Sequence, residues 1–214
     1  MQPQLADVVA DLERARARLH RLADALPAER WARRADPARW SVAECVAHLN
    51  LTAQAYAPVL RAGLDEAAAL GGPAPPRYRR DAVGWLISRM VGPMPRIAQW
   101  RIGRMRTPAA FVPTGDLPRD ATLREFDARQ DELLGFVREA DGRPLDRVRV
   151  TSPFDARARY NLFAALAMQA PHQHRHLQQA EADAGRRAHA HTASACCRWR
   201  CWWGTCIASA ANRL

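Results

Sequence analysis

The sequence predicts an all-α protein, a four-helix bundle with an irregular insertion between the second and third helices. Three observations lead to this prediction. Apolar residues recur at spacings of three and four over four long segments. The second of these segments has a strong helix start and a clear stop. The third begins only after a stretch of about 40 residues with mixed character, and such a delayed helix is compatible with bundle topology.

The first two helices are expected over 4–26 and from Ser41 to about residue 70. The first has an apolar stripe formed by Leu5, Val8, Leu12, Leu19, Leu22 and Leu26. Before the second, Ser41 is a capping residue, and Glu44 three positions later completes a capping box. Trp40 and Cys45 occupy the hydrophobic staple positions. The sequence "GGPAPP" at 71–76 ends this helix.

Residues 77–118 are expected to form one or two short helices and an extended stretch that lie across the bundle. Segment 77–106 has eight arginines against one acid, with three aromatic residues between them. This composition is compatible with a lid over a site, with a basic channel that attracts an anionic substrate, or with a surface that binds an acidic partner. The alternative is an amphipathic cover whose arginine stems lie on apolar surface.

A third long helix is predicted over 120–140 and a fourth over 155–184, ending at Gly185. The inward residues of the third are Leu123, Phe126, Leu133, Leu134 and Val137. The connector between them has room for one short strand. Pro171 lies inside the fourth segment and should kink or bulge it, because proline lacks the backbone N–H that a helix interior uses.

Composition divides the chain into a body, 1–185, and a tail, 186–214. The body has 27 Arg and 22 acidic residues, and the tail adds 5 Arg and no acid to give the net charge of +10. Four of the five cysteines and three of the seven tryptophans lie in the tail. It suits a zinc module with His189 and His191, or a membrane-touching segment around Trp202 and Trp203. We expect neither, and predict a disordered extension.

Several classes of protein are not expected. The N-terminal residues have acids and no apolar core, so no signal peptide is predicted, and no run approaches the roughly 20 apolar residues of a membrane span. The single cysteine of the body, Cys45, indicates a reduced, cytoplasmic protein. Nucleic acid is not an expected partner, because half of the excess charge belongs to the tail and no binding motif is present.

Three histidines form the chief functional motif of the fourth segment, in "APHQHRHLQQAE" at 170–181. On a helix His172 and His176 share one face, and His174 points away. The pair is either half of a metal site or part of a polar helix surface, and the spacing does not decide. A third imidazole is available from His48 on the second helix, at the margin of its apolar stripe. Three histidines and an exchangeable position are a common way to hold catalytic zinc.

Three stretches resemble a known family, the DinB-like superfamily of bacterial four-helix bundles. "RWSVAECVAHLNLT" (39–52) is similar to its second-helix motif, "RTPAAFVP" (106–113) to the loop before the third helix, and "SPFDARARYNLFAALAMQAPHQHRHLQQAE" (152–181) to its fourth-helix block. The resemblance covers roughly residues 4–184.

The resemblance implies that His48, His172 and His176 are metal ligands, with zinc or nickel as the metal. Relatives include enzymes that use a low-molecular-weight thiol. This implies activation of a thiol or water against a small electrophilic substrate, by a transferase or a hydrolase. The alternative is a non-catalytic bundle, stabilised by metal or binding a partner. The resemblance is also compatible with a homodimer that forms through one helix face.

Three further residues near these motifs are candidates for the site. Gln179 follows His176 and can hydrogen-bond a metal ligand. Arg175 can bind an anionic substrate, or be an ordinary exposed arginine. Glu44 can act as a general base one turn before His48, although the capping box explains it equally. No further catalytic residue is assigned.

Overall fold

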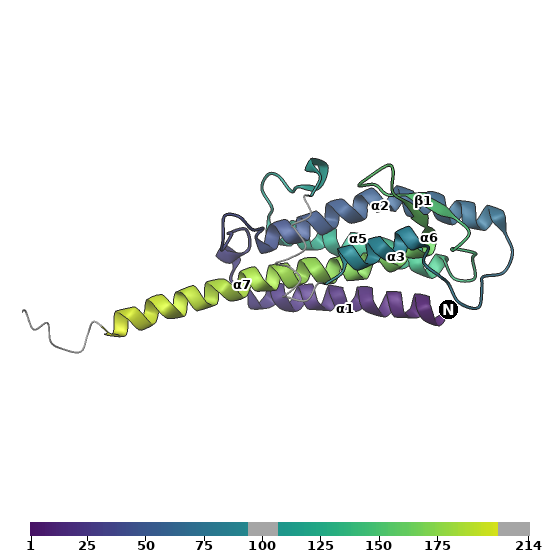
Figure 1. Ribbon diagram of the computed structural model, residues 1–214. Helices are drawn as coiled ribbons and strands as arrows, with labels where there is room; N and C mark the ends of the chain where they lie inside the picture. Colours follow the sequence, from purple (N-terminus) through teal and green to yellow (C-terminus); the bar gives the residue numbers. More distant parts are fainter. Residues whose placement is uncertain (94–106, 201–214) are drawn as a thin grey trace, which may run out of the picture.

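Four long helices form the bundle in the computed structural model, which describes residues 1–93 and 107–200, and side chains to residue 185. These helices are α1 (Pro3–Ala25), α2 (Val42–Leu70), α5 (Arg119–Glu139) and α7 (Gln169–Arg200). They run along a common long axis, and α7 continues beyond the others at one end (Figure 1). The prediction of an all-α four-helix bundle is confirmed, and three of the four helices begin and end within two residues of the expected bounds.

The start of α2 is built as the sequence predicts. Ser41 Oγ accepts a hydrogen bond from the Glu44 backbone N–H at 3.2 Å, and the Glu44 carboxylate accepts one from the Ser41 N–H at 2.8 Å. The helix ends at Gly71, whose φ of 59° is a conformation that glycine adopts easily. The capping box fixes where α2 begins, and therefore which of its residues face α7.

The insertion contains helix α3 (Ala82–Val91) and a short 3-10 helix, η2 (Ala109–Phe111). Residues 94–106, which contain four of the eight arginines of segment 77–106, lie outside the described residues. Helix α3 packs on α6 (Leu162–Ala167) and α7, and at Gly84 a Cβ atom would lie only 2.4 Å from that of Ala164 in α6. The described part of the insertion therefore contains short helices, as predicted, and α3 runs along the side of the bundle rather than across it (Figure 1).

The fourth segment differs from the single helix expected over 155–184. A strand, β2 (Arg159–Asn161), comes first, and the helix is then divided into α6 and α7 at Met168. The division has the predicted cause: Pro171 has no N–H to donate to the carbonyl four residues earlier. The helix also continues through Gly185 to Arg200, because one glycine in a helix costs only about 1 kcal/mol relative to alanine.

A β-hairpin replaces the one short strand that the connector was expected to contain. Strand β1 (Arg149–Thr151) pairs antiparallel with β2, with Val150 opposite Tyr160. Asn161 then caps α6 by accepting a hydrogen bond from the Ala164 N–H at 2.9 Å. The hairpin lies against α2 and α3 on the side of the bundle, and the first residues of the expected helix are extended because they form β2 (Figure 1).

The interior of the bundle is mostly apolar, and one amide pair joins α5 to α7 within it. Gln130 on α5 and Gln173 on α7 are both buried, and their side chains exchange hydrogen bonds of 3.1 and 2.7 Å. Gln130 also donates to the Leu12 carbonyl on α1 at 2.7 Å. These bonds fix the rotation of α7, which directs the neighbouring His172 and His176 toward α2. None of the described helices combines the length and hydropathy needed to cross a membrane.

Candidate metal centre

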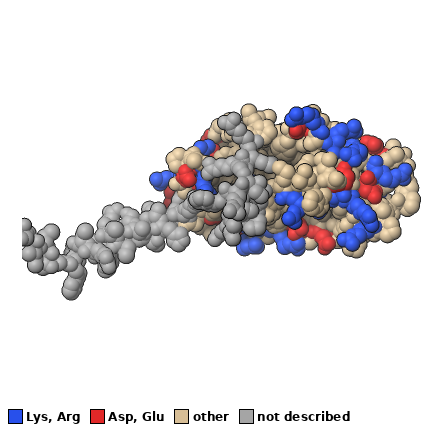
Figure 2. Space-filling model, viewed as in Figure 1, with Lys and Arg blue, Asp and Glu red and all other residues tan. Residues whose placement is uncertain are grey.

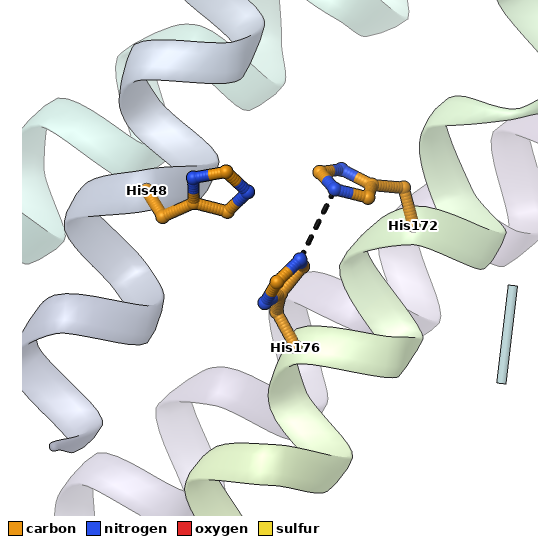
Figure 3. Close-up of side chains that lie close together, drawn as sticks. All are labelled: His48, His172 and His176. Carbon is orange, nitrogen blue, oxygen red and sulfur yellow. Dashed lines mark hydrogen bonds between the residues drawn. The ribbon is translucent and has the colours of Figure 1, made fainter. Parts of the chain in front are cut away.

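His48, His172 and His176 converge in the space between α2 and α7. One nitrogen of each ring lies within 4.8 Å of the corresponding nitrogens of the other two. Figure 3 shows the three rings directed toward one another, one from α2 and two from successive turns of α7. The three residues that the sequence singled out as ligands are therefore brought together.

His48 is held by the backbone of η2. Its side chain is buried, and Nδ1 lies 2.8 Å from the carbonyl oxygen of Phe111. A carbonyl only accepts hydrogen bonds, so Nδ1 carries the proton and Nε2 keeps its lone pair. Such a contact fixes both the tautomer and the orientation of a metal-binding imidazole. Phe111 belongs to the "RTPAAFVP" stretch, but its role as an acceptor uses a backbone atom that the sequence could not indicate.

His172 and His176 approach each other through their Nε2 atoms, which lie 3.1 Å apart (Figure 3). With Zn–N distances of about 2.0–2.1 Å, two nitrogens of a tetrahedral site are about 3.3 Å apart. The observed separation is close to that value. The i, i+4 spacing on α7 therefore provides two donors at a distance that one metal ion can span.

The three imidazoles are kept neutral by their surroundings. Burial lowers the pKa of His48, although the Phe111 carbonyl opposes the shift. Burial, with His48 and Arg175 nearby, lowers the pKa of His172 to about 3. Burial and the neighbouring histidines also lower the pKa of His176 well below its ordinary value. Neutral imidazole is the form that binds metal, so the site is prepared for it at neutral pH.

The indole ring of Trp40 packs against one side of the histidine cluster. The Trp40 ring lies 4.9 Å from His48 and is stacked on His176 at 5.9 Å, measured between ring centroids. Trp40 is the residue just before the capping Ser41, so the hydrophobic staple position also places its indole against the cluster. The sequence indicated the staple position, and the contact with both histidines was not foreseen.

Gln179 lies one turn after His176, and its side chain acts as a hydrogen-bond partner that opposes the fall in the pKa of His176. No bond of ordinary geometry among the described residues reaches Nδ1 of His176, which is buried. A buried N–H or lone pair without a partner is costly. Gln179 is therefore a candidate partner for His176, and its role in orienting a metal ligand stays a prediction.

Arg175 and Glu44 have different surroundings. The Arg175 guanidinium is half-buried and donates to the carbonyl of Met90 in α3, and burial lowers its pKa. Within the part of the chain that the structure describes, it has no ion pair with a carboxylate. Glu44 is engaged at both oxygens, by Ser41 and by Arg34, whose Nε lies 2.8 Å away. These contacts support the capping role of Glu44 rather than that of a general base.

The remaining polar candidates lie elsewhere. His174 faces α1, where its Nδ1 is 3.4 Å from Arg18, so it points away from the cluster as expected. Cys45 is fully buried, and burial raises the pKa of its thiol, so it behaves as a small core residue. His189, His191 and the tail cysteines lie outside the residues whose side chains are described.

The donor set fits a divalent transition metal. All three donors are imidazole nitrogens, which suit zinc and nickel, whereas magnesium and calcium prefer oxygen. Within the described residues, this is the one group of histidine, cysteine and acidic side chains close enough together to hold an ion. The buried Nδ1 of His176 leaves Nε2 as the atom that faces the other rings.

Comparison with known proteins gives the family. Residues 11–180 match the sequence profile of the DinB superfamily, which is well over half of the chain. No curated protein and no solved structure matches the chain significantly. The matched range contains all three histidines, and both the family and the cluster are compatible with a metal-dependent role. The fold and the match together establish that this chain belongs to the DinB superfamily.

Proposed function

We propose that the protein is a divalent-metal-dependent enzyme that joins a thiol, or adds water, to a small electrophilic molecule. His48, His172 and His176 hold the metal, which is zinc or nickel. The observation that carries the proposal is the convergence of three neutral imidazoles whose nitrogens lie within 4.8 Å of one another. A bound divalent ion would supply Lewis acidity, lowering the pKa of a thiol or water toward neutrality.

The protein's own groups support this chemistry in distinct ways. The Phe111 carbonyl holds His48 in the tautomer whose Nε2 can bind. Trp40 shields His48 and His176 on one side, which limits the access of bulk water. Arg175 adds a positive charge beside His172 and His176 without a carboxylate to neutralise it among the described residues. A thiolate or another anionic group would be attracted to that charge.

The alternative function is a bundle that uses the metal for stability alone. The supporting observation is that the three histidines come from two helices far apart in the chain, so an ion would tie α2 to α7. Binding that exists only in the folded state is folding free energy. Both functions predict metal binding, and only the first predicts turnover.

The test begins with the metal content of the purified full-length protein and of three variants, His48→Ala, His172→Ala and His176→Ala. We expect about one zinc or nickel ion per chain in the parent and its loss in each variant. His174→Ala is the matched control, since His174 lies on the same helix and faces α1. Metal retained in all three variants would show that another part of the chain binds it.

Activity is then tested with low-molecular-weight thiols and small electrophiles, with water as the competing nucleophile. We expect consumption of an electrophile by the metal-loaded parent, and none by the His48→Ala protein. Stoichiometric metal binding without turnover, together with a large loss of thermal stability on chelation, would favour the structural role.

We also place the protein in the cytoplasm, in contact with a small-molecule substrate. Cys45 supports this location, because it is a free, buried thiol and the only cysteine among the described side chains. We further propose a homodimer formed through one helix face, because helical bundles of this kind often pair in this way. Light scattering, which gives the mass of the protein in solution, tests this proposal.

A further inference from the structure

Helix α3 has an apolar face that points away from the bundle. Its docking face is formed by Gly84, Ile87 and Val91, which pack on the core. Val83, Trp85, Leu86 and Met90 lie on the other side and are exposed, Trp85 by 56% and Leu86 by 52%. These four account for most of the large exposed apolar side chains among the described residues. A contiguous set of this kind marks an interaction site more often than scattered apolar residues do.

Arginines surround this apolar face. Arg77, Arg79 and Arg80 precede α3 and are exposed, and the Arg89 guanidinium lies 5.9 Å above the Trp85 ring. Among the residues that the structure describes, none of these four arginines forms an ion pair with a carboxylate. The one acid of residues 77–92, Asp81, is held by Arg149 at 2.9 Å. In the half of the molecule that contains α3, blue side chains border tan surface, with some red acidic side chains among them (Figure 2).

A hollow of about 500 Å³ lies between the arginines and the start of α3. It is lined by Gln4, Arg77, Arg79, Arg80, Trp85 and Phe163, together with the buried Tyr78. The Arg80 guanidinium lies over the Phe163 ring at 5.9 Å, which positions its charge at the wall of the hollow. The lining contains several cationic groups and no acid, so the hollow is suited to a phosphate group.

We propose that this surface, hereafter the α3 surface, binds an anionic lipid bilayer. It consists of the four arginines and the four exposed apolar residues named above. Headgroup phosphates would occupy the hollow, while Trp85 and Leu86 enter the interface between headgroups and acyl chains. Aromatic and apolar residues flanked by arginine are the pattern of helices that lie in a membrane interface. The protein would adsorb to the bilayer without spanning it.

Other occupants fit the surface less well. Two copies of the chain related by a two-fold axis would place arginines against arginines, which is unfavourable. Nucleic acid would contact the arginines but leave Val83, Leu86 and Met90 in water. A bilayer with anionic lipids neutralises the charges and buries the apolar residues in one contact. This proposal concerns a different surface from the histidine cluster and does not depend on the proposed enzymatic activity.

The test is co-sedimentation of the full-length protein with vesicles of phosphatidylcholine alone, or of phosphatidylcholine with phosphatidylglycerol. We expect binding to the second kind only, weakened by salt. Arg79→Gln/Arg80→Gln should lower the partition coefficient about thirtyfold, because each basic residue near such a surface contributes about fivefold. Trp85→Ser/Leu86→Ser should lower it through loss of the apolar contact. Circular dichroism and thermal unfolding check that both variants remain folded.

The matched control is Arg124→Gln/Arg138→Gln, which removes the same charge from exposed positions on α5. It should bind vesicles nearly as the parent does. Equal binding by the parent and both α3 variants would overturn the proposal and assign vesicle binding to another part of the chain, such as the basic tail.

Two further results would also overturn it. Inorganic phosphate that displaces the protein from vesicles at constant ionic strength would make the hollow a site for free phosphate. Binding of a single-stranded RNA that depends on Arg79 and Arg80 but not on Trp85 and Leu86, without vesicle binding, would make the surface a nucleic-acid site.

Discussion

Gln130 and Gln173 form a reciprocal amide pair across the interior of the bundle, with each side chain donating to the other. Both are buried, and Gln173 lies beside His172 in the chain. The pair joins α5 to α7 by directional bonds in an interior that is mostly apolar. It therefore determines how α7 is rotated, which apolar packing alone specifies less strictly.

Replacing both members of this pair should cost less than the sum of the two single replacements. Gln173→Leu leaves the Gln130 amide with one partner missing, and we expect a loss of about 1–3 kcal/mol in the free energy of unfolding. Gln130→Leu/Gln173→Leu should cost less than the sum of the two single changes, because no buried amide remains without its partner. Urea unfolding of the three proteins gives the coupling energy. Strict additivity would show that the two side chains act independently.

The metal-free protein should lose stability as the pH falls below about 6.5. The pKa of each cluster histidine is lower in the folded state than in the unfolded chain, and that of His172 falls to about 3. Between these values the unfolded state binds more protons, so acid favours unfolding. Stability is complete above pH 6.5. It falls by up to about 1.4 kcal/mol per pH unit for each histidine until its folded pKa is reached.

This pH dependence is measured by urea unfolding from pH 7.5 to 5 in the presence of a chelator. The comparison is with His48→Gln, which removes one titrating group and should reduce the slope. Carboxylates titrate mostly below this range and affect both proteins alike. Identical slopes in the two proteins would show that His48 does not remain neutral in the folded protein.

Glu44→Gln should separate the two roles considered for this residue. Glutamine can still accept the bond from the Ser41 N–H, so the capping box remains, while the ion pair with Arg34 is lost. We expect a change of less than about 1 kcal/mol in unfolding free energy and unchanged metal content and turnover. Glu44→Ala, which removes the cap bond as well, should cost about 1 kcal/mol. A drop in turnover with Glu44→Gln at full metal content would restore the general-base role.

Gly84→Ala should weaken the docking of α3. A Cβ atom there would lie 2.4 Å from the Ala164 Cβ and 2.7 Å from the Asp81 carboxylate, so the backbone must shift. Overpacking of this kind costs about 1–3 kcal/mol. Gly135→Ala on α5 is the matched control, because no atom lies within 4 Å of its added Cβ and alanine favours the helix by about 1 kcal/mol. Thermal unfolding should therefore shift downward for the first variant and upward for the second.

The sequence predicted the parts of the fold that depend on periodic apolar residues and local caps. Helices α1, α2 and α5 follow from such stripes, and the start of α2 from Ser41 and Glu44. The β-hairpin was only half foreseen, because each strand has three residues and too few positions to establish an alternating pattern. The break at Met168 followed from Pro171, but the extended residues before α6 depend on pairing with β1, which is a tertiary contact.

The site was predictable in its residues but not in what surrounds them. The three histidines followed from i, i+4 spacing and a family motif, and the structure brings them together. The amide pair of Gln130 and Gln173 was missed because a polar residue next to an apolar stripe is normally assigned to the exposed edge of the helix rather than to its buried face. The stacking of Trp40 on His176 was missed because it depends on how two helices pack, which local sequence does not specify.

The acceptor for His48 is a backbone oxygen, and this affects how the site can change over generations. No exchange of the Phe111 side chain deletes that oxygen, so substitutions at this position leave the histidine tautomer intact as long as η2 keeps its path. Insertions and deletions between α3 and α5 act differently, because they displace the carbonyl itself. Changes in the length of this segment, rather than in its amino-acid composition, are therefore expected to disrupt the histidine site in related chains.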